Sequence, residues 1–212
     1  MDLANKIAAS LAKKLGYSDE QRAVIAYGLG AALQMLELFG IALLFGLVFD
    51  CVYECMIIFI GVGLLRRTTG GTHCTTYMAC ILTSSLSICL LAFVCRYLIP
   101  AWLDKWFYIL LGMVPAVVCF FVIAHKRVPL DSPNKPITNP AKIARLRRQC
   151  FITAIAYLLF AAHLLIHNWG EGRNVSSFCS IIVVFYWQSF TLTKWSNRLA
   201  QSMDRLFTNE IQ

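Results

Sequence analysis

His73 and Cys80 stand seven positions apart in a polar stretch, residues 66–80, that is rich in threonine and glycine. A cysteine attacks a carbonyl carbon as its thiolate, and it needs a base or a cation within hydrogen-bond reach. Of the four histidines, His73 stands beside cysteines in a polar segment. The pair therefore has the residue types that a cysteine peptidase uses. The alternative is that both are ordinary residues at a membrane boundary.

The spacing of this pair makes a structural demand. Seven residues of continuous α-helix advance about 10.5 Å, which is too far for a hydrogen bond between the two side chains. The Gly70–Gly71 pair allows the chain to turn. We therefore predict a helix that starts near residue 76 and places Cys80 in its first turn, where the helix dipole favours a thiolate. Three threonines are candidate caps for this helix: Thr72, Thr75 and Thr76.

The neighbours of the pair have two readings each. Cys74 is a competing nucleophile, but it is adjacent to His73, and we expect it to point elsewhere as an inert small residue. Arg66 and Arg67 are either topology charges at the inner boundary or ligands of negative charge. In the second case, one of them binds a substrate carboxylate or the oxyanion of a tetrahedral intermediate.

Two acidic residues elsewhere in the chain are further candidates. Glu37 lies with Gln34 inside the first apolar segment, and an ionisable group at such depth is a functional candidate by default. A structural hydrogen bond to a neighbouring helix is the other reading of Glu37. Asp131 is the acid in a long basic loop, where it either orients His73 as a third catalytic member or makes a local turn or ion pair.

The composition indicates which elements must position these residues. The chain has 212 residues, of which 58% are hydrophobic and 14% charged, whereas soluble domains carry about a quarter charged residues. A hydrocarbon core of about 30 Å needs about 20 apolar residues as a helix. We therefore predict an all-α, polytopic membrane protein with one domain over residues 1–212. The predicted transmembrane helices number about six: 23–49, 51–65, 81–99, 106–124, 151–167 and 177–193.

Residues 1–20 precede these segments and have an amphipathic pattern. Leu3, Ile7 and Leu11 fall on one face, with lysines around the other. Such a helix either lies in an anionic membrane interface or packs on the bundle, and the pattern favours neither reading.

The charges indicate an orientation. The net charge is +8, and all but Arg96, Lys105 and Arg173 of the nineteen Lys and Arg residues fall on one side of the predicted topology. The positive-inside rule places that side, with both termini and residues 66–80, in the cytoplasm. Because the charges lie between apolar segments, we expect lipid contacts and no nucleic-acid partner. Residues 125–150 form a basic cytoplasmic loop with four prolines, which favour extended backbone, and its basic residues anchor it to headgroups or bind a ligand.

Several of these residues resemble the motifs of the AgrB family, the accessory gene regulator membrane peptidases of Gram-positive bacteria. The residues that match the family's arginine, glycine-rich turn, histidine and cysteine are Arg66, Gly71, His73 and Cys80. Residues 131–137 end in an Asn-Lys-Pro-Ile element like that of the family, and Tyr27-Gly28-Leu29 resembles its first-helix motif. Two positions depart from the pattern, because Cys74 and Gly30 stand where many members have alanine and glutamate.

The resemblance implies a reaction, in which Cys80 and His73 are catalytic. Cys80 attacks an AgrD-like precursor peptide at the junction of its cysteine-containing core and acidic tail. The tail leaves, and the acyl-thioester then cyclises to a thiolactone or lactone used in quorum sensing. The resemblance also implies a bacterial cell membrane and a homodimer, with no metal and no cofactor. The candidates for substrate binding or transition-state support are Arg66, Arg67, Gly71, Glu37, Asp131 and Lys135.

Two other functions fit parts of the sequence. A small peptide transporter or exporter explains the helices and basic loops, but it gives no role to the spacing of His73 and Cys80. A metal-sensing adaptor would use His73, Cys74 and Cys80 as ligands, but zinc needs a fourth ligand that the sequence does not supply. Cys51 and Cys55 are four positions apart, and no second ligand pair accompanies them.

Overall fold

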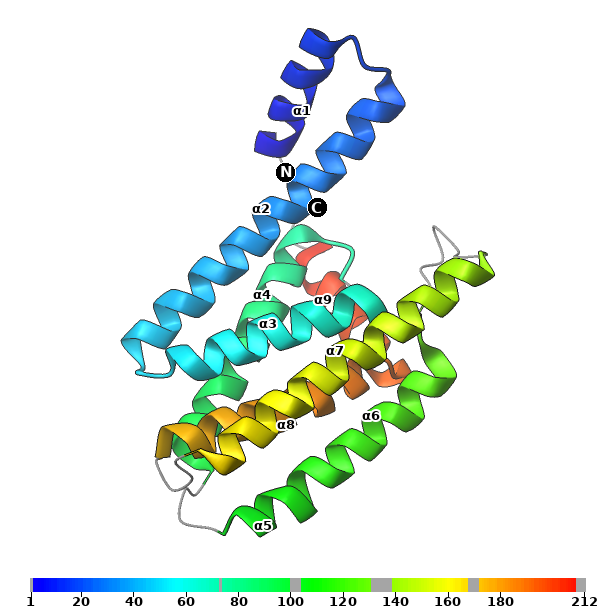
Figure 1. Ribbon diagram of the computed structural model, residues 1–212. Helices are drawn as coiled ribbons and strands as arrows, with labels where there is room; N and C mark the ends of the chain where they lie inside the picture. Colours follow the sequence, from blue (N-terminus) through cyan, green and yellow to red (C-terminus); the bar gives the residue numbers. More distant parts are fainter. Residues whose placement is uncertain (1, 73, 100–103, 131–138, 168–171, 209–212) are drawn as a thin grey trace.

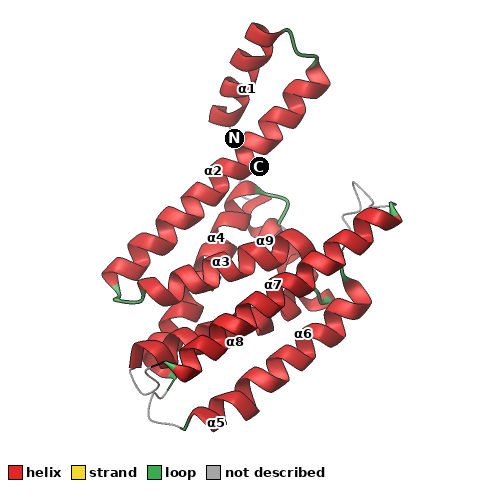
Figure 2. Ribbon diagram, viewed as in Figure 1, coloured by secondary structure: helices red, strands yellow, loops and turns green. Residues whose placement is uncertain are grey.

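The computed structural model describes residues 2–72, 74–99, 104–130, 139–167 and 172–208, and no strand occurs among them (Figures 1 and 2). The helices are α1 (Asp2–Leu15), α2 (Asp19–Val48), α3 (Val52–Thr69), α4 (Tyr77–Phe93), α5 (Lys105–Phe107), α6 (Val114–Arg127), α7 (Pro140–Ile166), α8 (Gly172–Thr191) and α9 (Lys194–Thr208). A π-helical stretch, Val94–Leu98, continues α4, and another, Tyr108–Met113, joins α5 to α6. The predicted all-α class is confirmed.

The described helices are long and apolar enough for a multi-pass membrane protein. Four pass on length and hydropathy: α2, α4 with its π-helical continuation, the α5–α6 rod, and α7. The pair α8 and α9 makes a fifth if it is taken as one span bent by 80°. This count is lower than the predicted six because α3 has 18 residues and includes Glu54, Arg66 and Arg67.

Helix α3 lies at the centre of the bundle and packs against α2, α4, α7 and α8. Its buried face carries Ile58 and Leu65, which join Phe120 and Phe185 in one hydrophobic core. Large apolar side chains such as Leu36, Leu86 and Leu159 are exposed on the surface of the bundle. A hydrocarbon environment explains that exposure, because lipid tails cover such side chains at no cost.

Helix α1 packs along the N-terminal half of α2, and this hairpin projects from the rest of the bundle (Figure 1). The buried residues of α1 are Ala4, Ala8 and Ala12. Ser18 and Gln21 form a capping box that fixes the start of α2. The predicted N-terminal helix is confirmed, and the structure has it packed on its neighbour. Contact of α1 with a membrane surface stays a prediction.

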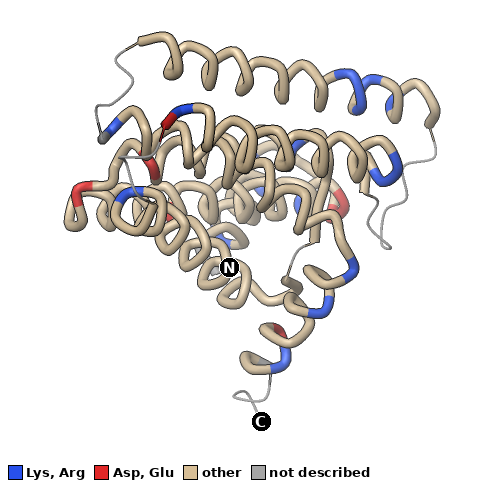
Figure 3. Tube along the Cα trace, turned by 90° about the horizontal axis from the view of Figure 1, so that it is seen from below, with Lys and Arg blue, Asp and Glu red and all other residues tan. Residues whose placement is uncertain are grey.

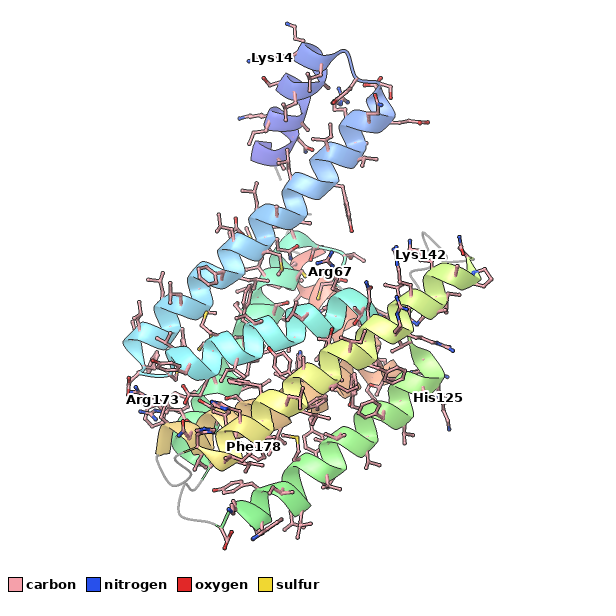
Figure 4. The ribbon with its side chains drawn as sticks, viewed as in Figure 1. Lys14, Arg67, His125, Lys142, Arg173 and Phe178 are labelled. Atoms are coloured by element: carbon pink, nitrogen blue, oxygen red, sulfur yellow. The ribbon has the colours of Figure 1, made fainter. Side chains whose placement is uncertain are left out.

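The charged residues gather toward the two ends of the bundle, with uncharged stretches between them (Figure 3). Arg67, His125 and Lys142 lie toward one end and Arg173 at the other (Figure 4). This separation agrees with the charge bias in the sequence. The side of the membrane that each end faces stays a prediction.

The basic segment 125–150 is more helical than predicted. Helix α6 extends to Arg127, and α7 starts at Pro140, so the prediction of a loop across the whole segment is wrong. Asn139 explains the start of α7, because its side chain accepts hydrogen bonds from the backbone N–H groups of Ala141 and Lys142. Proline is compatible with the first turn of a helix, where its missing N–H has no intrahelical partner to lose.

Candidate functional site

The helical chain breaks between α3 and α4, as the spacing of His73 and Cys80 demands. Helix α3 ends at Thr69, and α4 begins at Tyr77. The backbone N–H of Cys80 donates to the carbonyl of Thr76, 3.1 Å away, so Cys80 lies in the first turn of α4. The predicted break and helix start are confirmed. His73 lies outside the described residues.

Helix α8 holds the backbone of this break. The buried Gln188 side chain donates to the Thr69 hydroxyl, 2.6 Å away, and to the carbonyl of Gly70, 3.2 Å away. The backbone N–H and the hydroxyl of Thr72 both donate to the carbonyl of Thr191, at 3.3 and 3.0 Å. The loop between α3 and α4 is therefore attached to α8 on both sides of Gly71.

Gly70 is the position in this loop where a side chain is least tolerable. Its φ of 72° and ψ of −156° belong to a region that is essentially confined to glycine. A Cβ at Gly70 would lie 2.5 Å from the carbonyl oxygen of Leu130. The loop therefore depends on glycine at this position.

We expect Gly70→Ala to lower the free energy of unfolding by about 1–3 kcal/mol through backbone strain. The clash of the new Cβ with the Leu130 carbonyl oxygen should lower it further. The measurement is thermal unfolding in detergent micelles. Gly30→Ala is the matched control, because a Cβ at Gly30 meets no atom within 4 Å and alanine favours a helix interior. Equal unfolding temperatures for the two variants would contradict the strain at Gly70.

Cys80 and Arg66 line the same pocket, which has a volume of about 60 Å³. Its apolar wall includes Trp187, Phe190 and Leu199, from α8 and α9. The Arg66 guanidinium donates to the backbone carbonyl of Thr72, at the position before His73. The space is large enough for a few water molecules, and both a cationic side chain and a thiol line it.

The two arginines differ in their surroundings. Arg66 is half-buried at the pocket, whereas Arg67 is exposed at the end of the bundle (Figure 4). Gly71 lies between Arg66 and Thr191, because a Cβ on Gly71 would lie 3.7 Å from Arg66 Nε and 3.4 Å from Thr191 Oγ1. Of the two predicted arginines, Arg66 lines the pocket with Cys80.

Cys74 lines the pocket together with Cys80, so the prediction that it points elsewhere is wrong. Its thiol lies 3.9 Å from the Thr83 hydroxyl. Burial raises the pKa of the Cys74 thiol, and the hydrogen bond with Thr83 opposes that change only in part. Because the thiol is the less nucleophilic form, Cys74 is poorly suited to attack a carbonyl, although it shares the site.

The start of α4 is capped by a residue from the far end of the chain. The carboxylate of Asp204, on α9, accepts hydrogen bonds from the backbone N–H groups of Thr75 and Thr76 at 2.8–3.0 Å. It also accepts the Thr76 hydroxyl at 3.0 Å. Thr76 occupies the N-cap position, but its side chain does not cap the helix. The sequence gives no local signal for this contact of Asp204, and the prediction that a threonine side chain caps α4 is wrong.

Comparison with known proteins shows which family the chain belongs to. The model of the family Accessory gene regulator B matches residues 4–192. The chain belongs to the AgrB family. An AgrB-like protein of Clostridium perfringens strain 13 is 28% identical over 99% of this chain and 98% of its own length. An AgrB-like protein of strain SM101 has the same identity and coverage. No solved structure matches.

The residues matched by the AgrB family model include the loop and α4 but end before α9. The match ends at Leu192, so the helix that carries Asp204 and closes one side of the pocket lies beyond it. The two AgrB-like relatives align over nearly the whole chain. The AgrB match therefore includes Cys80 and Arg66, whereas the cap on α4 comes from a part of the chain that it does not cover.

The remaining predicted site residues lie apart or outside the description. Glu37, on α2, accepts a hydrogen bond of 2.7 Å from the hydroxyl of Tyr77, three positions before Cys80. A hydrogen bond to a neighbouring helix was one of the two predictions for Glu37. This bond links α2 to the start of α4. Asp131 and Lys135 lie outside the described residues. Within the described part of the chain, no group of three or more His, Cys, Asp or Glu residues could hold a metal ion.

Proposed function

We propose that the chain is a membrane cysteine endopeptidase that processes a quorum-sensing precursor peptide. Membership in the AgrB family supports a quorum-sensing role of the AgrB type. The observation that carries the peptidase proposal is the position of Cys80, in the first turn of α4 and on the same pocket as Arg66. The positive end of the helix dipole and the Arg66 guanidinium are both suited to stabilise the negative charge that develops in the transition state of acyl transfer.

In the proposed first step, the thiolate of Cys80 attacks the carbonyl at the junction of core and tail in an AgrD-like precursor. His73 takes the thiol proton and returns it to the leaving amine. The C–N bond breaks, the acidic tail departs with a free amino group, and the core stays bound to Cys80 as an acyl-thioester. Arg66 holds the carbonyl of Thr72 and so fixes the backbone at the position before His73.

In the second step, a thiol or hydroxyl of the bound peptide attacks the thioester carbonyl. The bond from the carbonyl to Cys80 breaks, and a thiolactone or lactone ring leaves while Cys80 regains its proton. Water must be kept from the acyl-thioester until the ring closes. The apolar wall of Trp187, Phe190 and Leu199 next to Cys80 supplies that protection. The reaction would take place at the cytoplasmic face of a bacterial cell membrane, in contact with lipids and in a homodimer.

The acidic tail would bind near the basic residues that begin α7. Lys142 and Arg145 are exposed there, and Lys135 precedes them in the sequence. Replacing Lys135, Lys142 and Arg145 with glutamine should raise the KM for the precursor several-fold and weaken its salt dependence, while kcat stays the same. The measurement is cleavage rate against precursor concentration at low and high salt. Lys105→Gln is the control at the other end of the bundle, and an unchanged KM in the triple variant would exclude tail binding at this site.

The test of the proposed function is co-expression of the chain with the short peptide encoded beside its gene. That peptide is recognised by an amphipathic start and an acidic end. Mass spectrometry of the membrane fraction should find the core without its tail, as a ring one water lighter than the linear core. Export of the intact precursor with its tail attached would instead support a transporter.

A further inference from the structure

We propose that Asp204 is a positioning residue for the nucleophile, because its carboxylate on α9 supplies the N-terminal cap of the helix that presents Cys80. This inference rests on the proposed peptidase function. It adds a role for α9, which lies beyond the AgrB match. Asp204 is not a catalytic residue in this proposal, because it acts on Cys80 through the backbone.

The hydrogen bonds form a short path from Asp204 to Cys80. Asp204 Oδ1 accepts the N–H of Thr75 at 2.9 Å, the N–H of Thr76 at 3.0 Å and the Thr76 hydroxyl at 3.0 Å, and Oδ2 accepts the N–H of Thr75 at 2.8 Å. The carbonyl of Thr76 in turn accepts the N–H of Cys80 at 3.1 Å. The peptide unit that begins the turn of Cys80 is therefore fixed by a residue 128 positions along the chain.

The start of α4 has no side-chain cap on its first-turn N–H groups, and Asp204 instead holds the two residues that lead into the helix. A threonine at the N-cap normally accepts a hydrogen bond from an N–H of the first turn. The hydroxyl of Thr76 instead donates to Asp204, and Thr76 makes no side-chain cap bond. A carboxylate at this end of the helix also interacts favourably with the helix dipole.

Asp204 carries a negative charge at neutral pH in this setting. Burial raises the pKa of its carboxyl, but the hydrogen bonds from Thr75 and Thr76 more than offset that effect and leave the pKa below its ordinary value. The part of this stabilisation that depends on the charge is therefore present above the ordinary pKa of an aspartate and is lost as the pH falls through the lowered value. The neutral carboxyl keeps an oxygen that accepts hydrogen bonds, as an asparagine amide does.

Helix α9 packs against α4 and α8 and is anchored at its corner with α8. It turns by 80° from α8, and the Arg127 guanidinium donates to the carbonyl of Leu192 at the corner, 2.7 Å away. Ser196, Leu199 and Ala200 on α9 line the pocket beside Cys80. The same helix therefore forms one wall of the site and caps the helix that carries the nucleophile.

The test compares Asp204→Ala with Asp204→Asn in the full chain, by measuring cleavage rate against precursor concentration. The alanine variant should lose about ten-fold in kcat with little change in KM, because it removes every acceptor of the cap. The asparagine variant should stay within about two-fold of the unchanged protein, because one amide oxygen can still accept the bonds now made to Oδ1. Asp104→Ala is the matched control. Asp104 accepts the N–H of Trp106 at 3.1 Å at the start of α5, and its loss should leave kcat unchanged.

Amide hydrogen exchange of the segment 74–82 supplies a readout that does not depend on peptidase activity. Exchange should become faster in Asp204→Ala and stay unchanged in Asp204→Asn and Asp104→Ala. If the asparagine variant loses as much kcat as the alanine variant, the charge matters and the capping proposal is overturned. Unchanged exchange in Asp204→Ala would overturn it as well. If cleavage persists without Cys80, the peptidase function fails, and the exchange result still decides whether Asp204 caps α4.

Discussion

Replacing Cys80 with alanine should abolish removal of the precursor tail, whereas Cys74→Ala should leave cleavage within about three-fold of the unchanged protein. The two thiols line one pocket, so they meet the same substrate and the same reagents. The loss at Cys80 should be about 10³-fold or more, because no acyl-thioester can form without the nucleophile. The measurement is mass spectrometry of the co-expressed precursor, with the amount of each variant in the membrane determined in parallel.

Alkylation supplies the control for this comparison. Iodoacetamide should modify Cys80 faster than Cys74 at neutral pH, because the buried Cys74 thiol has a raised pKa and the thiolate is the reactive form. His73→Ala should abolish cleavage and leave the protein folded. Tail removal that persists in Cys80→Ala, or that disappears in Cys74→Ala, would refute the assignment of the nucleophile.

The break before Cys80 could be predicted from sequence because its causes are local. Two glycines follow Thr69, and the first of them adopts a backbone conformation that other residues avoid. A hydrophobic run of span length predicted α4 after the break, and a shorter hydrophobic run predicted α3 before it. The start of α4 at Tyr77 is within one residue of the prediction.

The supports of the break could not be predicted, because they come from distant parts of the chain. Gln188 and Thr191 reach the loop from 119 positions away, and Asp204 from 128. Helical periodicity predicts which face of α9 is apolar. It does not predict that Asp204 on α9 accepts hydrogen bonds from the backbone of Thr75 and Thr76. The side chain of Cys74 was misplaced for a related reason, because its direction depends on loop dihedrals that residue types do not determine.

The prolines near residue 140 illustrate an ambiguity in a local signal. Proline blocks the interior of a helix but suits its first turn, and the same residue type therefore predicts a loop or a helix start. Asn139 decides between them, because its side chain caps α7. The Asn139–Pro140 pair before a run of basic residues is the local sequence signal for this helix start.

Arg66→Gln should lower kcat/KM about 100-fold, whereas Arg67→Gln should change it by less than about two-fold. Arg66 is half-buried, lines the pocket with Cys80 and donates to the carbonyl of Thr72. Glutamine removes the cation that favours a thiolate and an oxyanion, and a 100-fold loss corresponds to about 2.7 kcal/mol. Arg67 is its exposed neighbour on the same helix turn, so the pair separates a role in the site from a role in membrane topology.

Arg66→Lys tests whether charge alone is enough. A lysine keeps the positive charge but has a compact ammonium in place of the planar, forked guanidinium. It cannot hold the carbonyl of Thr72 and face the pocket in the same geometry, so we expect it to recover only part of the lost kcat/KM. Full recovery by lysine would show that the site needs a cation without the Thr72 contact. An equal loss of kcat/KM in Arg66→Gln and Arg67→Gln would contradict a specific role of Arg66 in the site. Both arginines would then be topology charges, and neither would stabilise the oxyanion.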